Sequence, residues 1–227
     1  MIKIENMHLR DVFFNELLKK MEKDRNILLL TNDMGAPSLD KFKENVPEQV
    51  INMGITEQNI IGTAAGLSSK GKKIVIYSIS TFITLRSFEQ IKLDICVMRL
   101  PVIIITVGAG YSYSVDGPTH HAIDDISVMN TLVNMNIYSP SDSLITKRIS
   151  RDIFNFKKIN YVRLDRGKWP ILSKVKANLK SGFRIISQGE DLCIISTANM
   201  VHQSLSIANE LKNYKINTTV IDLFRIK

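Results

Sequence analysis

The chain has 227 residues, of which 44% are hydrophobic and 23% charged, and its net charge is +8, a balance that suits one folded domain with part of another. The longest apolar run is far shorter than the roughly 20 residues of a membrane-spanning helix, and the first residues lack the apolar core of a secretory signal, so we expect a cytoplasmic protein with no membrane partner. The lysines are scattered rather than gathered in a basic stripe with aromatic residues, which argues against nucleic-acid binding.

Short segments rich in apolar and β-branched residues predict a series of buried strands. The predicted strands lie at 27–30, 50–53, 74–77, 102–107, 137–138 and 161–164. Their apolarity is continuous rather than alternating, which is typical of a parallel sheet covered on both faces. Helical periodicity predicts helices between them at about 9–21, 57–69, 85–98 and 142–156, the last with Asp142 as its N-cap. Regular alternation of strand and helix indicates an α/β fold with a doubly wound, mostly parallel sheet.

A change of composition towards lysine, proline and glycine divides the chain after this pattern. We expect a first domain at 1–167, a connecting segment at 168–189 and an incomplete second α/β unit at 190–227. The second unit contains one predicted strand–helix–strand motif between residues 192 and 223. A single such motif cannot close a core alone, so we expect it to pack on the first domain, to pack on a partner, or to be the start of a truncated domain.

Glu57 is the first candidate for chemistry. The turn Gly54-Ile55-Thr56 leads into a helix that begins near Glu57, and this carboxylate lies on the same stripe as Ile60 and Ala64. A carboxylate at the head of an apolar stripe tends to be removed from water. The spacing alone slightly favours the alternative, a first-turn Glu that points to solvent and complements the helix dipole.

Several motifs follow one another in the order of a known family. Gly54-Ile55-Thr56-Glu57-Gln58-Asn59, Ser80-Thr81-Phe82 and Asp116-Gly117-Pro118-Thr119-His120 resemble segments of the pyrimidine-binding domain of transketolase-like, thiamine-diphosphate enzymes. The end of the chain, Val220 to Lys227, is similar to the opening of that family's C-terminal domain. The resemblance covers nearly the whole chain, and the ordered set of motifs is far more specific than any one of them.

The resemblance implies roles at a cofactor. Glu57 would contact N1′ of the aminopyrimidine of thiamine diphosphate and favour its imino tautomer, which makes it both catalytic and cofactor-binding. Phe82 would stack on the pyrimidine, and Asp33 would contribute at the cofactor site related by the dimer. The simpler alternatives are an ordinary core phenylalanine for Phe82 and a turn residue for Asp33.

The resemblance also implies roles at the substrate. Asp116 and the catalytic His120 would lie near the donor sugar, where hydroxyl groups are recognised and developing oxyanions are stabilised. Arg166 falls where the family has an arginine that binds substrate phosphate, a task that suits a planar guanidinium. Arg163 competes for that role, and Asp116 considered alone is explained equally well as a turn residue.

One part of a complete enzyme is missing from the sequence. The family binds the diphosphate and Mg²⁺ through a Gly-Asp-Gly signature, which this sequence does not contain. The resemblance therefore implies that a separate N-terminal transketolase subunit holds the diphosphate and Mg²⁺, with no metal ligand supplied by this chain. The two kinds of subunit would assemble as a dimer of heterodimers, a heterotetramer.

We expect the chain to be the pyrimidine-binding subunit of a split transketolase, a transferase that moves a two-carbon ketol unit between sugar phosphates in carbohydrate metabolism. A second possibility keeps the cofactor and changes the reaction, to that of a deoxyxylulose-phosphate synthase or of a 2-oxo-acid dehydrogenase β-subunit. A third is a truncated, non-catalytic scaffold, although a scaffold needs neither Glu57, Phe82 nor His120.

Overall fold

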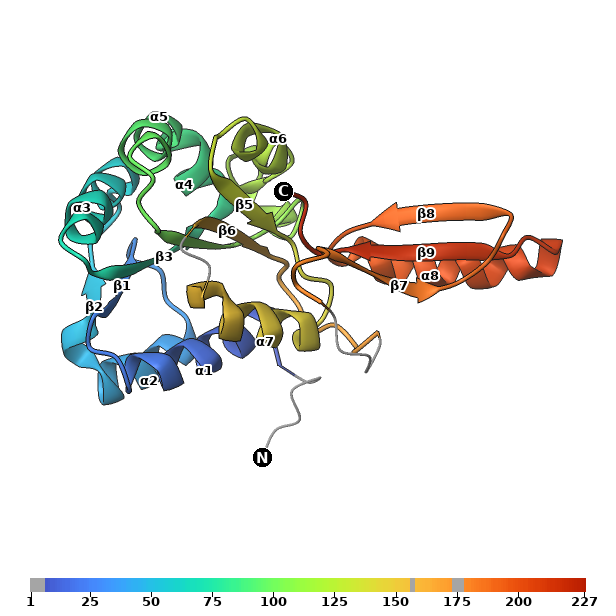
Figure 1. Cartoon of the computed structure of the whole chain (residues 1–227), viewed down its shortest axis with the longest axis horizontal. Helices are drawn as coiled ribbons and strands as arrows, with labels where there is room; N and C mark the ends of the chain where they lie inside the picture. Colours follow the sequence, from blue (N-terminus) through green and yellow to red (C-terminus); the bar gives the residue numbers. More distant parts are fainter. Residues whose placement is uncertain (1–6, 156–157, 173–177) are drawn as a thin grey trace.

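The predicted strands of the first domain form one parallel, six-stranded sheet in the order β2-β1-β3-β4-β6-β5 (Figure 1). The computed structural model describes residues 7–155, 158–172 and 178–227. The strands are β1 (Ile27–Thr31), β2 (Val50–Asn52), β3 (Lys73–Ile79), β4 (Ile103–Val107), β5 (Met135–Tyr138) and β6 (Ile159–Leu164). The order runs in both directions from β1 and β3, as in a doubly wound sheet, so the predicted fold class is confirmed.

Helices cover both faces of this sheet (Figure 1). One face carries α1 (Leu9–Met21), α2 (Pro37–Asn45) and α7 (Ser143–Asp152); the other carries α3 (Glu57–Ser69), α4 (Ser80–Arg86), α5 (Phe88–Gln90), the π-helix η3 (Ile91–Val97) and α6 (Asp125–Asn130). Along β3, Val75 and Tyr77 pack into the core beneath α1, whereas Ile74 and Ile76 pack into the core beneath α3. Continuous apolarity therefore reflects two separate cores on one strand.

The helix expected at 85–98 is interrupted and begins earlier. It starts at Ser80, breaks at Ser87 (φ −116°) and continues as α5 and η3. The hydroxyl groups of Thr84 and Ser87 donate to the carbonyl oxygens of Ser80 and Ile83, four residues back, at 2.7 and 2.8 Å. Such back-bonding bends helices, which explains the break and places the last residue of α4, Arg86, at a bend.

The second unit is a small three-stranded sheet in the order β7-β9-β8. It contains β7 (Phe183–Ser187), β8 (Leu192–Ser196), α8 (Met200–Leu211) and β9 (Thr218–Leu223). The strand β7 lies in the segment expected to be a connection and runs antiparallel to β9. In Figure 1 the unit projects from the β5 edge of the main sheet, with α8 along one face of the small sheet.

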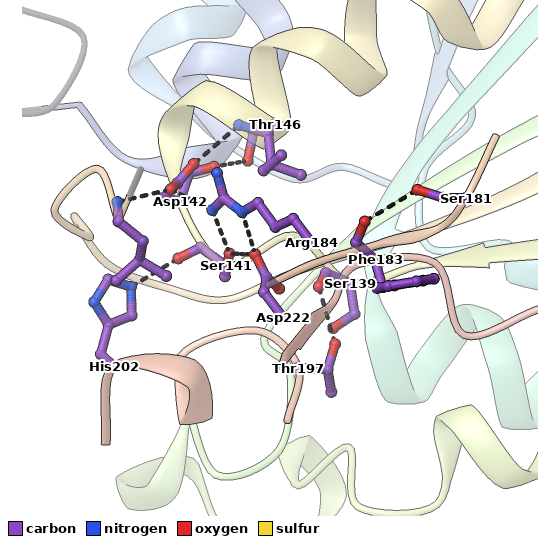
Figure 2. Close-up of polar contacts among 12 residues, drawn as sticks. Ser139, Ser141, Asp142, Thr146, Ser181, Phe183, Arg184, Thr197, His202 and Asp222 are labelled. Atoms are coloured by element: carbon purple, nitrogen blue, oxygen red, sulfur yellow. Dashed lines mark hydrogen bonds and ion pairs between the residues drawn. The ribbon is translucent and has the colours of Figure 1, made fainter. Parts of the chain in front are cut away.

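A buried ion-pair network joins the two units (Figure 2). Arg184 of β7 contacts Asp142, the N-cap of α7, at 2.6 Å and Asp222 of β9 at 2.8 Å. Ser141 donates to the Asp222 carboxylate at 2.5 Å, and burial is the main reason that the pKa of Asp222 is raised. Because these charges are buried, each depends on its partners, and the second unit is held firmly against the first.

Candidate active site

The candidate residues come from segments that follow successive strands at the carboxyl edge of the main sheet. Glu57 follows β2, Phe82 follows β3, His120 follows β4 and Arg166 follows β6. Because all six strands are parallel, their carboxyl ends share one edge of the sheet, which is where open α/β sheets bind ligands. The fold therefore gathers residues that lie more than a hundred positions apart in the chain.

Glu57 is buried, as the apolar stripe of its helix predicted. Only 3% of its side chain is exposed, and its Oε2 lies 2.9 Å from Nη1 of Arg86. The guanidinium of Arg86 also lies over the ring of Phe82, 4.7 Å from the centroid. The solvent-pointing alternative for Glu57 is wrong, and the carboxylate and the aromatic ring meet at one cation.

From Phe82 a row of side chains extends along the edge towards Arg166. The ring of His120 packs edge-on to Phe82 with 4.9 Å between centroids, and Tyr113 packs against His120 at 5.9 Å. The guanidinium of Arg166 lies 5.0 Å from the centroid of the Tyr113 ring. We call the side chains from Glu57 through Arg86, Phe82, His120 and Tyr113 to Arg166 the edge row.

The sequence did not single out Tyr113. Its position depends on Gly108, which directly follows β4 with φ +92°. A Cβ atom at Gly108 would overlap the ring of Tyr113. The Gly108-Ala109-Gly110 pair of glycines was the available signal, because a glycine after a strand often marks a close approach to the backbone.

A cavity of about 550 Å³ opens beside Phe82, between α4 and the turn that contains His120. Its lining includes Thr81, Phe82, Leu85, Arg86, Pro118, Thr119, His121, Ile123 and Asp124. Thr81 ties its two walls together, because its hydroxyl donates to the carbonyl oxygen of Thr119 at 2.9 Å. Thr119 Oγ1 in turn shares a hydrogen bond of 3.0 Å with Nδ1 of His120.

The structure separates the two arginines that the sequence left in competition. Arg163 is buried, and its Nε donates to Asp125 at 2.7 Å while its Nη2 donates to the carbonyl oxygen of Ala122 at 3.3 Å. It therefore holds the segment that carries His120. Arg166 is exposed and lines a second cavity, of about 170 Å³, with His8, Arg10, Val107, Tyr113 and Asp165. Sequence reasoning missed Arg10 in this cluster.

Two of the candidate residues lie outside the edge row. Asp33 sits in a left-handed turn (φ 52°) at the end of β1, where its carboxylate accepts a hydrogen bond of 2.9 Å from Asn52. Asp116 is exposed, and within the described residues its side chain has no hydrogen-bond or ion-pair partner. The next residue, Gly117, has φ +82°, so the Asp-Gly-Pro segment forms the sharp turn that directs Asp116 outward.

Comparison with protein families decides what this edge belongs to. Residues 5–170 match the model of the transketolase pyrimidine-binding domain, and residues 182–227 match that of the transketolase C-terminal domain. The chain belongs to the transketolase family. This assignment implies thiamine diphosphate as the family's cofactor and confirms the resemblance seen in the motifs.

Individual transketolase relatives narrow the class. One subunit of the apulose-4-phosphate transketolase of Phocaeicola vulgatus is 31% identical over 229 residues, which cover 96% of this chain and 71% of that subunit. A solved structure described as a split-gene transketolase, inactive β4 tetramer, is 28% identical with a TM-score of 0.84 and covers 96% of this chain and 71% of its own. The chain is thus a transketolase-like transferase subunit of the split kind.

The alternative reaction has weaker support among the relatives. The 1-deoxy-D-xylulose-5-phosphate synthase of Chlamydia felis is 32% identical over 96% of this chain, but the match covers only 34% of that enzyme. Among the described residues of the transketolase chain, no helix is long and apolar enough to cross a membrane. No three His, Cys, Asp or Glu side chains in that part of the chain are grouped to hold a metal ion.

Proposed function

We propose that this chain is the pyrimidine-binding subunit of a split transketolase that moves a two-carbon ketol unit between sugar phosphates, and that its first domain, at 1–167, carries the site. The observation that carries the proposal is the buried Glu57 carboxylate beside the ring of Phe82 at the mouth of a cavity of about 550 Å³. A buried carboxylate and a flat apolar ring fit an aminopyrimidine, which has polar nitrogens at its rim and an aromatic face.

Glu57 and Phe82 would hold the pyrimidine of thiamine diphosphate. When bound, this cofactor supplies a nucleophilic carbon and an electron sink for cleaving the carbon–carbon bond next to a carbonyl. The task of Glu57 is to bind a ring nitrogen and select the tautomer, and that of Phe82 is to fix the plane of the ring. Asp33, at the end of β1, would contribute to the dimer-related site.

His120 would act on the donor sugar. Its Nδ1 is engaged by Thr119 at 3.0 Å, so Nε2 is the nitrogen left to bind a substrate hydroxyl or to stabilise developing negative charge. The neighbouring ring of Phe82, 4.9 Å away, fixes the imidazole next to the cofactor end of the edge row. The exposed Asp116, four residues earlier, would bind another hydroxyl of the sugar.

Arg166 would bind the substrate phosphate. The small cavity that it lines also contains Arg10 and His8, and guanidinium groups bind phosphate through paired, charge-assisted hydrogen bonds. The buried Asp165, whose pKa is raised mainly by burial, accepts a hydrogen bond of 2.8 Å from the backbone N–H of Asn199. This anchors the segment that carries Arg166 to the second unit.

The diphosphate and Mg²⁺ would be held by a separate N-terminal subunit. The sequence lacks Gly-Asp-Gly, and the relatives that support the family are themselves subunits of split enzymes. We therefore propose a dimer of heterodimers in which each site is shared by two kinds of chain, as the cofactor's two ends require.

Reconstitution tests this function. The chain is co-expressed with a subunit that contains Gly-Asp-Gly and assayed for ketol transfer from a ketose phosphate with thiamine diphosphate and Mg²⁺. We expect activity from the pair alone and its loss in Glu57→Gln. An inert pair, or full activity in Glu57→Gln, contradicts the catalytic assignment. Micromolar binding of thiamine diphosphate by this chain alone contradicts the shared site.

A further inference from the structure

Arg86 contacts both groups that the proposed function assigns to the pyrimidine. Its guanidinium pairs with the Glu57 carboxylate at 2.9 Å and covers the ring of Phe82 at 4.7 Å from the centroid. A planar cation with hydrogen-bond donors at its rim satisfies the same two surfaces that an aminopyrimidine would use. Arg86 and the ring would therefore compete for one position.

The two ends of this contact differ in their freedom to move. Glu57 is 3% exposed and fixed in the first turn of α3, whereas 49% of the Arg86 side chain is exposed. Arg86 is the last residue of α4, just before the break at Ser87, and its carbonyl oxygen accepts a hydrogen bond of 3.1 Å from Gln58. The backbone of Arg86 is thus tied to α3, while its side chain has an open path to solvent.

We infer that Arg86 is an exchangeable counter-ion of Glu57, which must leave the carboxylate and the Phe82 ring before the aminopyrimidine of the cofactor can bind. This inference rests on the proposed function. Because a buried carboxylate without a partner is costly, Arg86 stabilises the site before binding. The same contact opposes binding, since the cofactor gains only the difference between its own contacts and those of Arg86.

Arg86→Met removes the competitor while keeping a long side chain. In the purified complex with the Gly-Asp-Gly subunit and Mg²⁺, we expect the dissociation constant of thiamine diphosphate, measured by titration calorimetry, to fall about tenfold. Arg148→Met is the matched control, because Arg148 forms a helical surface ion pair with Asp152 and is 40% exposed; it should leave the constant unchanged. Arg86→Lys keeps the charge but not the planar group, so its constant should lie between those of the other two proteins.

The isolated chain provides a readout without the cofactor. Arg86→Met should lower the urea midpoint of unfolding, and Glu57→Gln in the same chain should restore most of the loss, because the unpaired charge is then gone. If Arg86→Met and Arg86→Lys bind the cofactor no more tightly than the unaltered complex, while Glu57→Gln still abolishes transfer, the inference is wrong and the proposed function stands. If the unaltered complex does not bind thiamine diphosphate at all, the proposed function itself fails.

Discussion

The backbone of Gly108 lies directly against the ring of Tyr113. With φ +92° at Gly108, no other residue combines that conformation with the close approach of the ring. Tyr113 in turn separates His120 from Arg166. A backbone feature at the end of β4 therefore sets the spacing between the sugar end and the phosphate end of the edge row.

Gly108→Ala tests this relationship. The added methyl group would displace the Tyr113 ring and strain the backbone, so we expect a loss of about 1–3 kcal/mol in the free energy of unfolding and a larger loss of ketol transfer. Gly66→Ala is the control, because Gly66 lies in α3 with open space around it; it should gain about 0.5–1 kcal/mol. Equal effects of both changes on activity would contradict the role of Gly108.

Arg166→Gln should weaken recognition of phosphate without weakening that of the cofactor. Charge-assisted hydrogen bonds contribute about 1.5–3 kcal/mol each, so we expect KM for a phosphorylated ketose to rise about 10- to 100-fold. The dissociation constant of thiamine diphosphate and the rate with an unphosphorylated ketose should not change. A parallel loss with both sugars would mean that Arg166 acts on the sugar chain or on the fold instead.

Arg184→Met should destabilise the whole chain. It would leave Asp142 and Asp222 buried without their cation, a change that costs about 3–5 kcal/mol. Urea unfolding followed by circular dichroism measures this loss. Arg184→Lys, which keeps the charge but not the forked geometry, should lose less. A loss below about 1 kcal/mol in Arg184→Met would show that the network is not a main support of the junction.

Glu16 should make stability depend on pH. Burial raises the pKa of Glu16, but hydrogen bonds from Arg151 and Lys19 outweigh burial, so that the pKa is lowered overall. A lowered carboxyl pKa contributes stability that is fully present above the unfolded value and is lost as pH falls through the folded value. Glu16→Gln should therefore cost about 1–2 kcal/mol at pH 7, and the difference from the unaltered chain should shrink below about pH 4.

Strands of the main sheet could be predicted because each has apolar residues on both faces, as Val75 and Ile76 do on β3. The strand β7 could not, because its pattern is inverted. Phe183 and Ile185 are exposed, whereas Arg184 between them is buried. Only the distant partners Asp142 and Asp222 make that inversion favourable, and no local pattern reveals them.

The candidate site shows the same division. The burial of Glu57 followed from the stripe that it shares with Ile60 and Ala64. Its contact with Arg86 did not, because that contact depends on where α4 breaks. The choice between Arg163 and Arg166 needed the direction of each side chain at the end of β6. The roles of the predicted site residues stay predictions until the reconstituted enzyme is assayed.

The edge row joins two tasks that are carried by different segments. Glu57 belongs to α3, whereas Arg166 follows β6, and Tyr113 and His120 lie between them. Substitutions near Arg166 can alter the preferred sugar while the end that handles the cofactor stays intact. Duplicated genes with this architecture could thus acquire new metabolic roles through a few changes at one end, without rebuilding their chemistry.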